Sequence, residues 1–131
     1  MPTLSVIAAI DVPADRVWEI IGDFADPSAW YPRQVQEHTV TERVVRAADG
    51  TRARERLITH DAAARSYTYE ERDGLRAVGR VGVESIAGGT MCLVVWSMRF
   101  AAPAERQLAV LRDLEHALMR PALRGLRTAF E

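Results

Sequence analysis

Two neighbouring segments near the middle of the chain, residues 51–60 and 66–72, constrain the fold most strongly. Both are predicted to be strands, in which alternate side chains point to opposite faces of the sheet. One face then consists mainly of arginine and glutamate side chains. The opposite face carries Glu55, Leu57, Thr59, Tyr67, Tyr69 and Glu71. An unpaired carboxylate is costly among aromatic side chains, so this second face is predicted to line a cavity that holds a ligand.

The length and charge of the chain exclude several classes of function. A chain of 131 residues is the size of one domain, and residues 1–131 are predicted to form a single ligand-binding domain. The net charge is −1, so no broad basic surface attracts nucleic acid. All 17 basic residues are arginine. Without lysine the chain can form no Schiff base and has no P-loop lysine.

The few metal-binding residue types are scattered. Cys92 is the only cysteine, and His38, His60 and His116 have no ligand spacing. We therefore expect neither a metal nor another cofactor. A single cysteine forms no internal disulfide, and the N-terminal residues resemble no signal peptide or transmembrane segment. These features favour a cytoplasmic protein.

The order of the predicted elements suggests an α+β fold. Residues 3–11 are a predicted strand, a helix follows from Pro13 to Gly22, and residues 23–32 are a loop or a short second helix. Predicted strands then cover residues 35–47, 51–60, 66–72, 77–86 and 90–100, with turns at Asp49-Gly50, Asp73-Gly74 and Gly88-Gly89. Strands joined by such short turns are antiparallel.

The last predicted element is one long helix over residues 104–130, which Pro121 should bend. Its apolar stripe consists of Leu108, Leu111, Leu114, Leu118, Ala122, Leu126 and Ala129. No other element is large enough to cover the dry face of the sheet. The predicted architecture is therefore a curved antiparallel sheet of six to seven strands wrapped around a long C-terminal helix, with one or two short helices after the first strand.

This order and several motifs resemble the helix-grip superfamily. The matching motifs are Pro13-Ala14-x-x-Val17-Trp18, Asp26-Pro27 with Trp30, Glu55-Arg56-Leu57…Asp61…Arg65-x-Tyr67-x-Tyr69, Gly89-Thr90…Trp96 and Leu123-x-x-Leu126. The superfamily is also called START-like or SRPBCC, and the bacterial polyketide cyclase/dehydrase-like branch is the most similar. The resemblance implies a hydrophobic cavity for lipids, polyketides or other small ligands. Carriers, receptors and enzymes all share this fold, so it implies no single activity.

The candidate catalytic residues are Glu55, Tyr67 and Tyr69. The resemblance places Glu55 where plant hormone receptors of this fold point a carboxylate into the cavity, as a polar anchor or general base. The alternative is an ion pair with an arginine such as Arg33 or Arg43. The two tyrosines can orient a carbonyl or protonate an enolate, or they can be core aromatics.

The predicted ligand-binding residues line the same cavity: Tyr31, Leu57, Val81, Val83, Trp96, Met98, Phe100, Leu114 and Leu118. Trp30, Tyr31 and Pro32 are either an apolar lip at its entrance or a staple for the preceding helix. Gly79 replaces an aromatic residue of many relatives, which predicts a local opening. His60 is expected on the outer face of its strand.

Two functions stay open. The first is binding of a small hydrophobic oxygenated ligand, polyketide- or lipid-like, with cyclase or dehydratase activity. The second is a non-catalytic lipid or quinone carrier, or a protein-interaction module. A homodimer through an exposed strand edge is the default oligomer.

Overall fold

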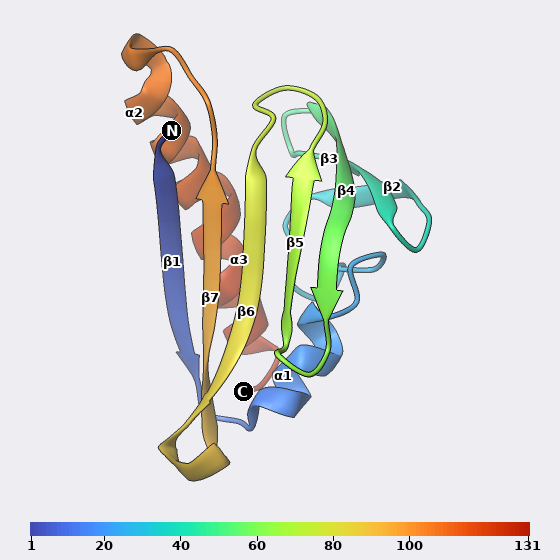
Figure 1. Ribbon diagram of the computed structural model, residues 1–131, viewed down its shortest axis with the longest axis vertical. Helices are drawn as coiled ribbons and strands as arrows, with labels where there is room; N and C mark the ends of the chain where they lie inside the picture. The colour runs from blue at the N-terminus through green and yellow to red at the C-terminus, as the bar shows by residue number, and fades with distance from the viewer.

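The computed structural model describes residues 1–131 and contains one sheet wrapped around one long helical segment (Figure 1). The sheet has seven antiparallel strands in the order β1-β7-β6-β5-β4-β3-β2. The strands are β1 (Thr3–Ile10), β2 (Gln34–His38), β3 (Glu42–Arg46), β4 (Arg52–Asp61), β5 (Ser66–Glu71), β6 (Val78–Ile86) and β7 (Met91–Arg99). The helices are α1 (Ala14–Ile21), α2 (Ala104–Asp113) and α3 (Arg120–Thr128). The predicted helix-grip architecture is confirmed.

The region between α1 and β4 differs from its prediction. Residues 35–47 form two strands rather than one, because the chain reverses between β2 and β3. Thr39 stabilises this turn, since its hydroxyl oxygen accepts hydrogen bonds from the N–H groups of Thr41 and Glu42. Residues 23–33 contain turns and no second helix. The N–H groups of Trp30 and Tyr31 both donate to the carbonyl of Pro27 in one of these turns.

A β-bulge in β4 changes which residues face inward. The pairing of β4 with β5 shifts between Leu57 and Thr59, so the alternation on which the prediction rested is interrupted there. Thr59 therefore lies on the outer face, where its hydroxyl is 2.6 Å from that of Thr68. His60 was expected at the surface on the outer face; it stays exposed, but it turns to the inner face, where its ring stacks on Tyr67 and its Nε2 donates to the carbonyl of Gly22.

The long C-terminal helix is confirmed, but it is not α-helical throughout. A π-helical segment (Leu114–Met119) joins α2 to α3. This wider turn shifts the helix phase, so the consecutive residues Leu118 and Met119 are both buried. Pro121 directly follows the π-helical segment, so its missing N–H falls where the hydrogen-bond pattern of the helix already changes. Leu108, predicted to belong to the apolar stripe, is 59% exposed.

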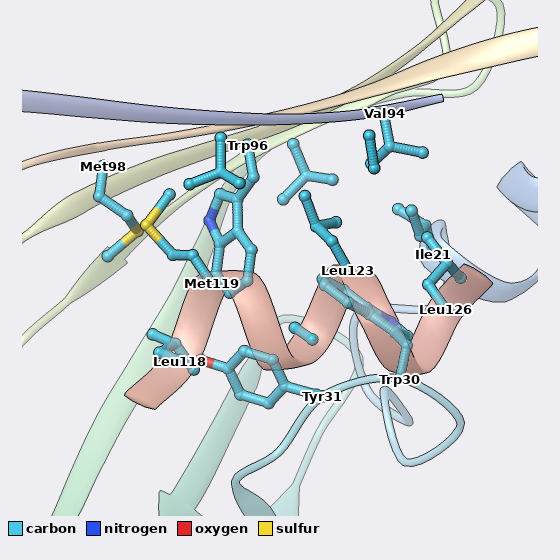
Figure 2. Packing of buried hydrophobic residues seen from close by; sticks show 14 of the residues in the cluster. Ile21, Trp30, Tyr31, Val94, Trp96, Met98, Leu118, Met119, Leu123 and Leu126 are labelled. Carbon is cyan, nitrogen blue, oxygen red and sulfur yellow. The ribbon is translucent and has the colours of Figure 1, made fainter. Parts of the chain in front are cut away.

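The hydrophobic core lies between the inner face of the sheet and this helix. Figure 2 shows Val94 and Trp96 of β7 pointing toward Met119, Leu123 and Leu126 of the helical segment. Burial of such side chains is the main source of stability in a domain of this size. None of the helices has both the length and the apolar sequence needed to cross a membrane.

Candidate functional site

Three charged side chains are buried in one row across the inner face of the sheet. Arg43 of β3 pairs in register with Glu55 of β4, and Glu55 pairs with Glu71 of β5. Arg43 and Glu55 are each 1% exposed, and Glu71 is 8% exposed. Charged groups are buried only where partners compensate them. The row is therefore the most unusual feature of the interior.

The carboxylate of Glu55 is surrounded by donors. Arg43 Nε lies 2.7 Å from one oxygen, the hydroxyl of Tyr31 donates to the other at 2.9 Å, and Arg33 Nη1 is 3.5 Å from that second oxygen. Glu55 thus forms ion pairs with Arg43 and Arg33, which is the alternative that the sequence left open beside a role as ligand anchor or general base. Both oxygens already accept hydrogen bonds, so these partners would have to move before Glu55 could take a proton from a substrate.

Arg43 is held by aromatic rings as well as by Glu55. Its Nη1 donates to the carbonyl of Phe24 at 2.8 Å, and the guanidinium lies over the rings of Phe24 and Tyr31 at 4.1 and 4.6 Å. Burial alone would lower the pKa of Arg43, but Glu55 and then Tyr31 outweigh burial and raise it. Arg43 therefore stays charged. Its Nη2 has no hydrogen-bond partner.

Tyr67 and Tyr69 lie on the inner face, as predicted. Burial raises the pKa of Tyr67 to about 12 and that of Tyr69 well above its usual value, so both hydroxyls are protonated at neutral pH. The Tyr69 hydroxyl accepts a hydrogen bond from Trp96 Nε1 at 3.1 Å and faces Met98 Sδ at 3.2 Å. Tyrosines in this state can donate hydrogen bonds but cannot act as bases.

The expectation of an opening at Gly79 is wrong. A Cβ atom added at Gly79 would lie 2.4 Å from Cζ of Tyr69. The missing side chain therefore makes room for the Tyr69 ring. Tyr69 occupies the space that the family resemblance predicted to be empty.

Most of the predicted ligand-binding residues lie in the closed interior between sheet and helix. A side chain that borders a water-sized cavity keeps some accessible surface, and Val81, Trp96 and Phe100 keep none. Val83, Met98, Leu114 and Leu118 are also buried, with at most 3% exposed. Leu57 is half-buried. The protein's own side chains fill the predicted cavity in this structure, and contact of these residues with a ligand stays a prediction.

An open cleft lies outside the core, beside the loop after α1. Its volume is about 570 Å³, and its walls are Ala25, Asp26, Ser28, Tyr31, Pro32, Arg33, Gln34, Val35 and His38. The predicted apolar lip is divided by the structure. Tyr31 and Pro32 line the cleft, whereas the ring of Trp30 packs inside, 5.4 Å from Trp96 between ring centres.

Sequence reasoning missed the importance of Arg43. It named this residue only as one partner of Glu55, and overlooked the aromatic rings and the free Nη2. A signal was present, since Arg43 has the same parity as the apolar Val45 in a short strand, and both are buried. A cluster of three or more His, Cys, Asp or Glu side chains suited to a metal does not occur.

Solved structures with the same fold cover nearly the whole chain. XoxI from Bacillus cereus is 25% identical, with a TM-score of 0.85 over 99% of this chain and 96% of that one. The di-domain ARO/CYC BexL of the BE-7585A biosynthetic pathway is 17% identical, with a TM-score of 0.79 over 98% of this chain and 46% of BexL. A START superfamily protein from Mycobacterium smegmatis is 10% identical, with a TM-score of 0.73 over 98% and 96%.

No curated protein matches the sequence. The family described as "Polyketide cyclase / dehydrase and lipid transport" matches residues 1–131. The match extends over the sheet, the buried charged row and the C-terminal helix. The chain therefore belongs to the polyketide cyclase/dehydrase and lipid transport family, within the START-like helix-grip fold.

Proposed function

We propose that the protein binds a small, mostly hydrophobic, oxygen-bearing molecule, polyketide- or lipid-like, between the sheet and the C-terminal helix. The position of Tyr31 carries this proposal. Tyr31 is one of the residues that line the external cleft, and its ring lies 6.0 Å from that of Trp96 in the core. One ring thus separates the cleft from the interior, and its displacement would join them.

The segment that carries Tyr31 is suited to such a movement. Residues 23–33 belong to no strand or helix, and the Tyr31 hydroxyl makes one hydrogen bond, to Glu55. A flat apolar ligand that replaced the ring would restore the close packing of the interior. The conformation with Tyr31 displaced needs only a small population in the free protein, because the ligand would stabilise it.

Two measurements test ligand binding. Native mass spectrometry of protein purified from its own host should show a hydrophobic small molecule at one equivalent or, if the ligand exchanges rapidly, the free chain. Fluorescence titration with the neutral probe N-phenyl-1-naphthylamine should then show saturable binding.

The probe should bind Tyr31→Ala about tenfold more tightly than native protein, because no ring competes for the space. Pro32→Ala is the matched control, since Pro32 lines the cleft. Absence of saturable probe binding in all three proteins, together with an empty native protein, would overturn the proposal.

A second function, cyclisation or dehydration of a polyketide-like substrate, is favoured by the fold shared with BexL and by the two neutral tyrosines. In this version Tyr67 and Tyr69 would donate hydrogen bonds to developing enolate oxygens, and Glu55 would move a proton after its partners rearranged. Tyr67→Phe and Tyr69→Phe should abolish turnover while probe binding persists. Full turnover in both variants would exclude the two hydroxyls from the chemistry, and absence of turnover in the native protein would leave a carrier that binds its ligand without transforming it.

A further inference from the structure

Two buried N–H donors in the interior have no hydrogen-bond acceptor: Trp30 Nε1 and Arg43 Nη2. Trp30 is 4% exposed and Arg43 is 1% exposed, so bulk water does not reach these groups. A buried donor without an acceptor lowers stability, and it is rare in folded proteins. The fold can supply acceptors to such groups, because the equally buried Trp96 Nε1 donates to Tyr69.

Both side chains contact the same ring. The ring centres of Trp30 and Tyr31 are 5.6 Å apart, and the Arg43 guanidinium lies 4.6 Å from the centre of the Tyr31 ring. Tyr31 therefore contacts both side chains that carry the unsatisfied donors, and it is also a residue that lines the external cleft. A molecule that displaced its ring would lie against both of them.

The two unsatisfied donors favour one kind of polar group. Trp30 Nε1 and Arg43 Nη2 can donate but not accept hydrogen bonds. Displacement of Tyr31 removes its hydrogen bond to Glu55, but Arg43 and Arg33 still donate to the two carboxylate oxygens. The space therefore favours ligand acceptors over ligand donors.

The charge of the site points to a neutral acceptor. The two arginines Arg33 and Arg43 balance the two carboxylates Glu55 and Glu71. A ligand carboxylate would add an unbalanced buried charge, which is far more costly than a neutral oxygen.

We propose that Trp30 and Arg43 form a carbonyl-recognition site, and that the ligand is a flat, neutral molecule with ketone or quinone oxygens that accept hydrogen bonds from Trp30 Nε1 and Arg43 Nη2. This inference rests on the proposed function and names the ligand class. The two donors carry it, since neither has an acceptor in good hydrogen-bond geometry within the protein and a bound carbonyl would supply one. The apolar part of the ligand would pack against Trp96 in place of Tyr31.

A pair of ligands with the same shape isolates the carbonyl group. 9-Fluorenone and fluorene differ in one oxygen, so their dissociation constants from the full chain compare binding with and without an acceptor. Fluorenone should bind about tenfold more tightly than fluorene, the difference expected for one added hydrogen bond to a charged donor. The indole N–H resonance of Trp30 should move further downfield with fluorenone than with fluorene, because a hydrogen bond to the carbonyl deshields this proton. That resonance is identified by its loss in Trp30→Phe, and the indole of Trp18 serves as the internal reference.

Two variants remove the donors separately. Trp30→Phe eliminates Nε1, and Arg43→Lys keeps a cation beside Glu55 but lacks Nη2. Each should reduce the preference for fluorenone several-fold, with little change in fluorene binding. Trp18→Phe is the matched control, because the ring contacts of Trp18 are with His60 and Tyr67 rather than with Trp30 or Tyr31, and it should keep the full preference. If Arg43→Lys does not fold, Trp30→Phe and the indole resonance of the native protein decide the question.

The outcomes separate the two proposals. Equal binding of fluorenone and fluorene would overturn the carbonyl site and leave the proposed hydrophobic binding intact. A preference that persists unchanged in Trp30→Phe and Arg43→Lys would also overturn it. Failure of both compounds and of the naphthylamine probe to bind would overturn both proposals together.

Discussion

The two halves of the inner face of the sheet are built from the same alternating strands, yet they bury different chemistry. On β7, Val94, Trp96 and Met98 are apolar and pack beneath the C-terminal helix (Figure 2). On β3 and β4, Arg43 and Glu55 occupy the corresponding inward positions. The difference lies in what covers each half.

A helix and a loop offer different partners to the strands they cover. A helix uses its own backbone groups internally, so α3 presents apolar side chains to the sheet. The loop at residues 23–33 leaves backbone groups free, and the carbonyl of Phe24 accepts a hydrogen bond from Arg43. The same loop supplies the Tyr31 hydroxyl to Glu55. Polar groups can therefore be buried under the loop, and both proposals concern that half of the molecule.

Breaking the charged half should have the largest effect. Glu55→Gln removes the carboxylate nearest to Arg43 and leaves a buried cation without its main partner. The free energy of unfolding should fall by about 3–5 kcal/mol in urea denaturation. Glu70→Gln is the control, because its pair with Arg56 is partly exposed, and should cost less than about 1 kcal/mol. Similar losses in the two variants would show that the Arg43–Glu55 pair is not specially important.

A cavity created in the apolar half should cause the second largest loss of stability. Leu126 is fully buried on α3, and Leu126→Ala should lower the free energy of unfolding by about 3 kcal/mol. Leu108→Ala, at an exposed position of α2, should change it by less than about 0.5 kcal/mol. If Leu108→Ala were as damaging as Leu126→Ala, α2 would pack in solution in a way this structure does not show.

Overfilling the boundary between the halves should have a smaller effect. Gly79→Ala places a methyl group against the Tyr69 ring and forces that ring to move. The expected loss is about 1–3 kcal/mol, measured as a lower Tm. Gly82→Ala on the same strand meets only the flexible end of Arg80 and should be nearly neutral. Unchanged Tm in Gly79→Ala would mean that the interior has spare volume beside Tyr69.

The smallest expected effect is a dependence on pH. Burial raises the pKa of Glu71, Arg33 opposes this shift and Glu55 reinforces it. The folded protein thus holds this proton more tightly than the unfolded chain, so stability falls as pH rises from the ordinary pKa of glutamate through the folded-state value. Glu71→Gln removes that dependence, and the native-minus-variant difference in unfolding free energy should fall as pH rises from about 4 to about 8. A difference that rises with pH would show that the pairing of Glu71 with Arg33 outweighs its burial.

The sequence was sufficient to predict the fold and the inward face of β5, because strict alternation places Tyr67 and Tyr69 on the same side. It was insufficient wherever one residue interrupts a repeat. The bulge between Leu57 and Thr59 reversed the predicted faces of Thr59 and His60, and the π-helical segment changed the buried stripe of the helix. Such interruptions depend on tertiary packing, which no local pattern records.

The closed interior also could not be predicted from the sequence. Tyr31, Tyr69 and Trp96 are suitable both for lining a cavity and for filling one, and only their mutual contacts show that they fill it. The row of Arg43, Glu55 and Glu71 was partly predictable from alternation. The missing partner of Arg43 Nη2 was not, since it depends on the placement of a loop without regular structure.

The π-helical segment has a consequence for the timescale on which parts of the helix open. Hydrogen bonds across this wide turn interrupt the α-helical ladder between α2 and α3. In α2 only Val110 is buried, whereas α3 buries Ala122, Leu123 and Leu126. Amide hydrogens of α2 should therefore exchange with solvent through local fraying, while those of α3 exchange only when the whole domain unfolds. The C-terminal helix is one element in shape but two in its dynamics, with the break at residues 114–119.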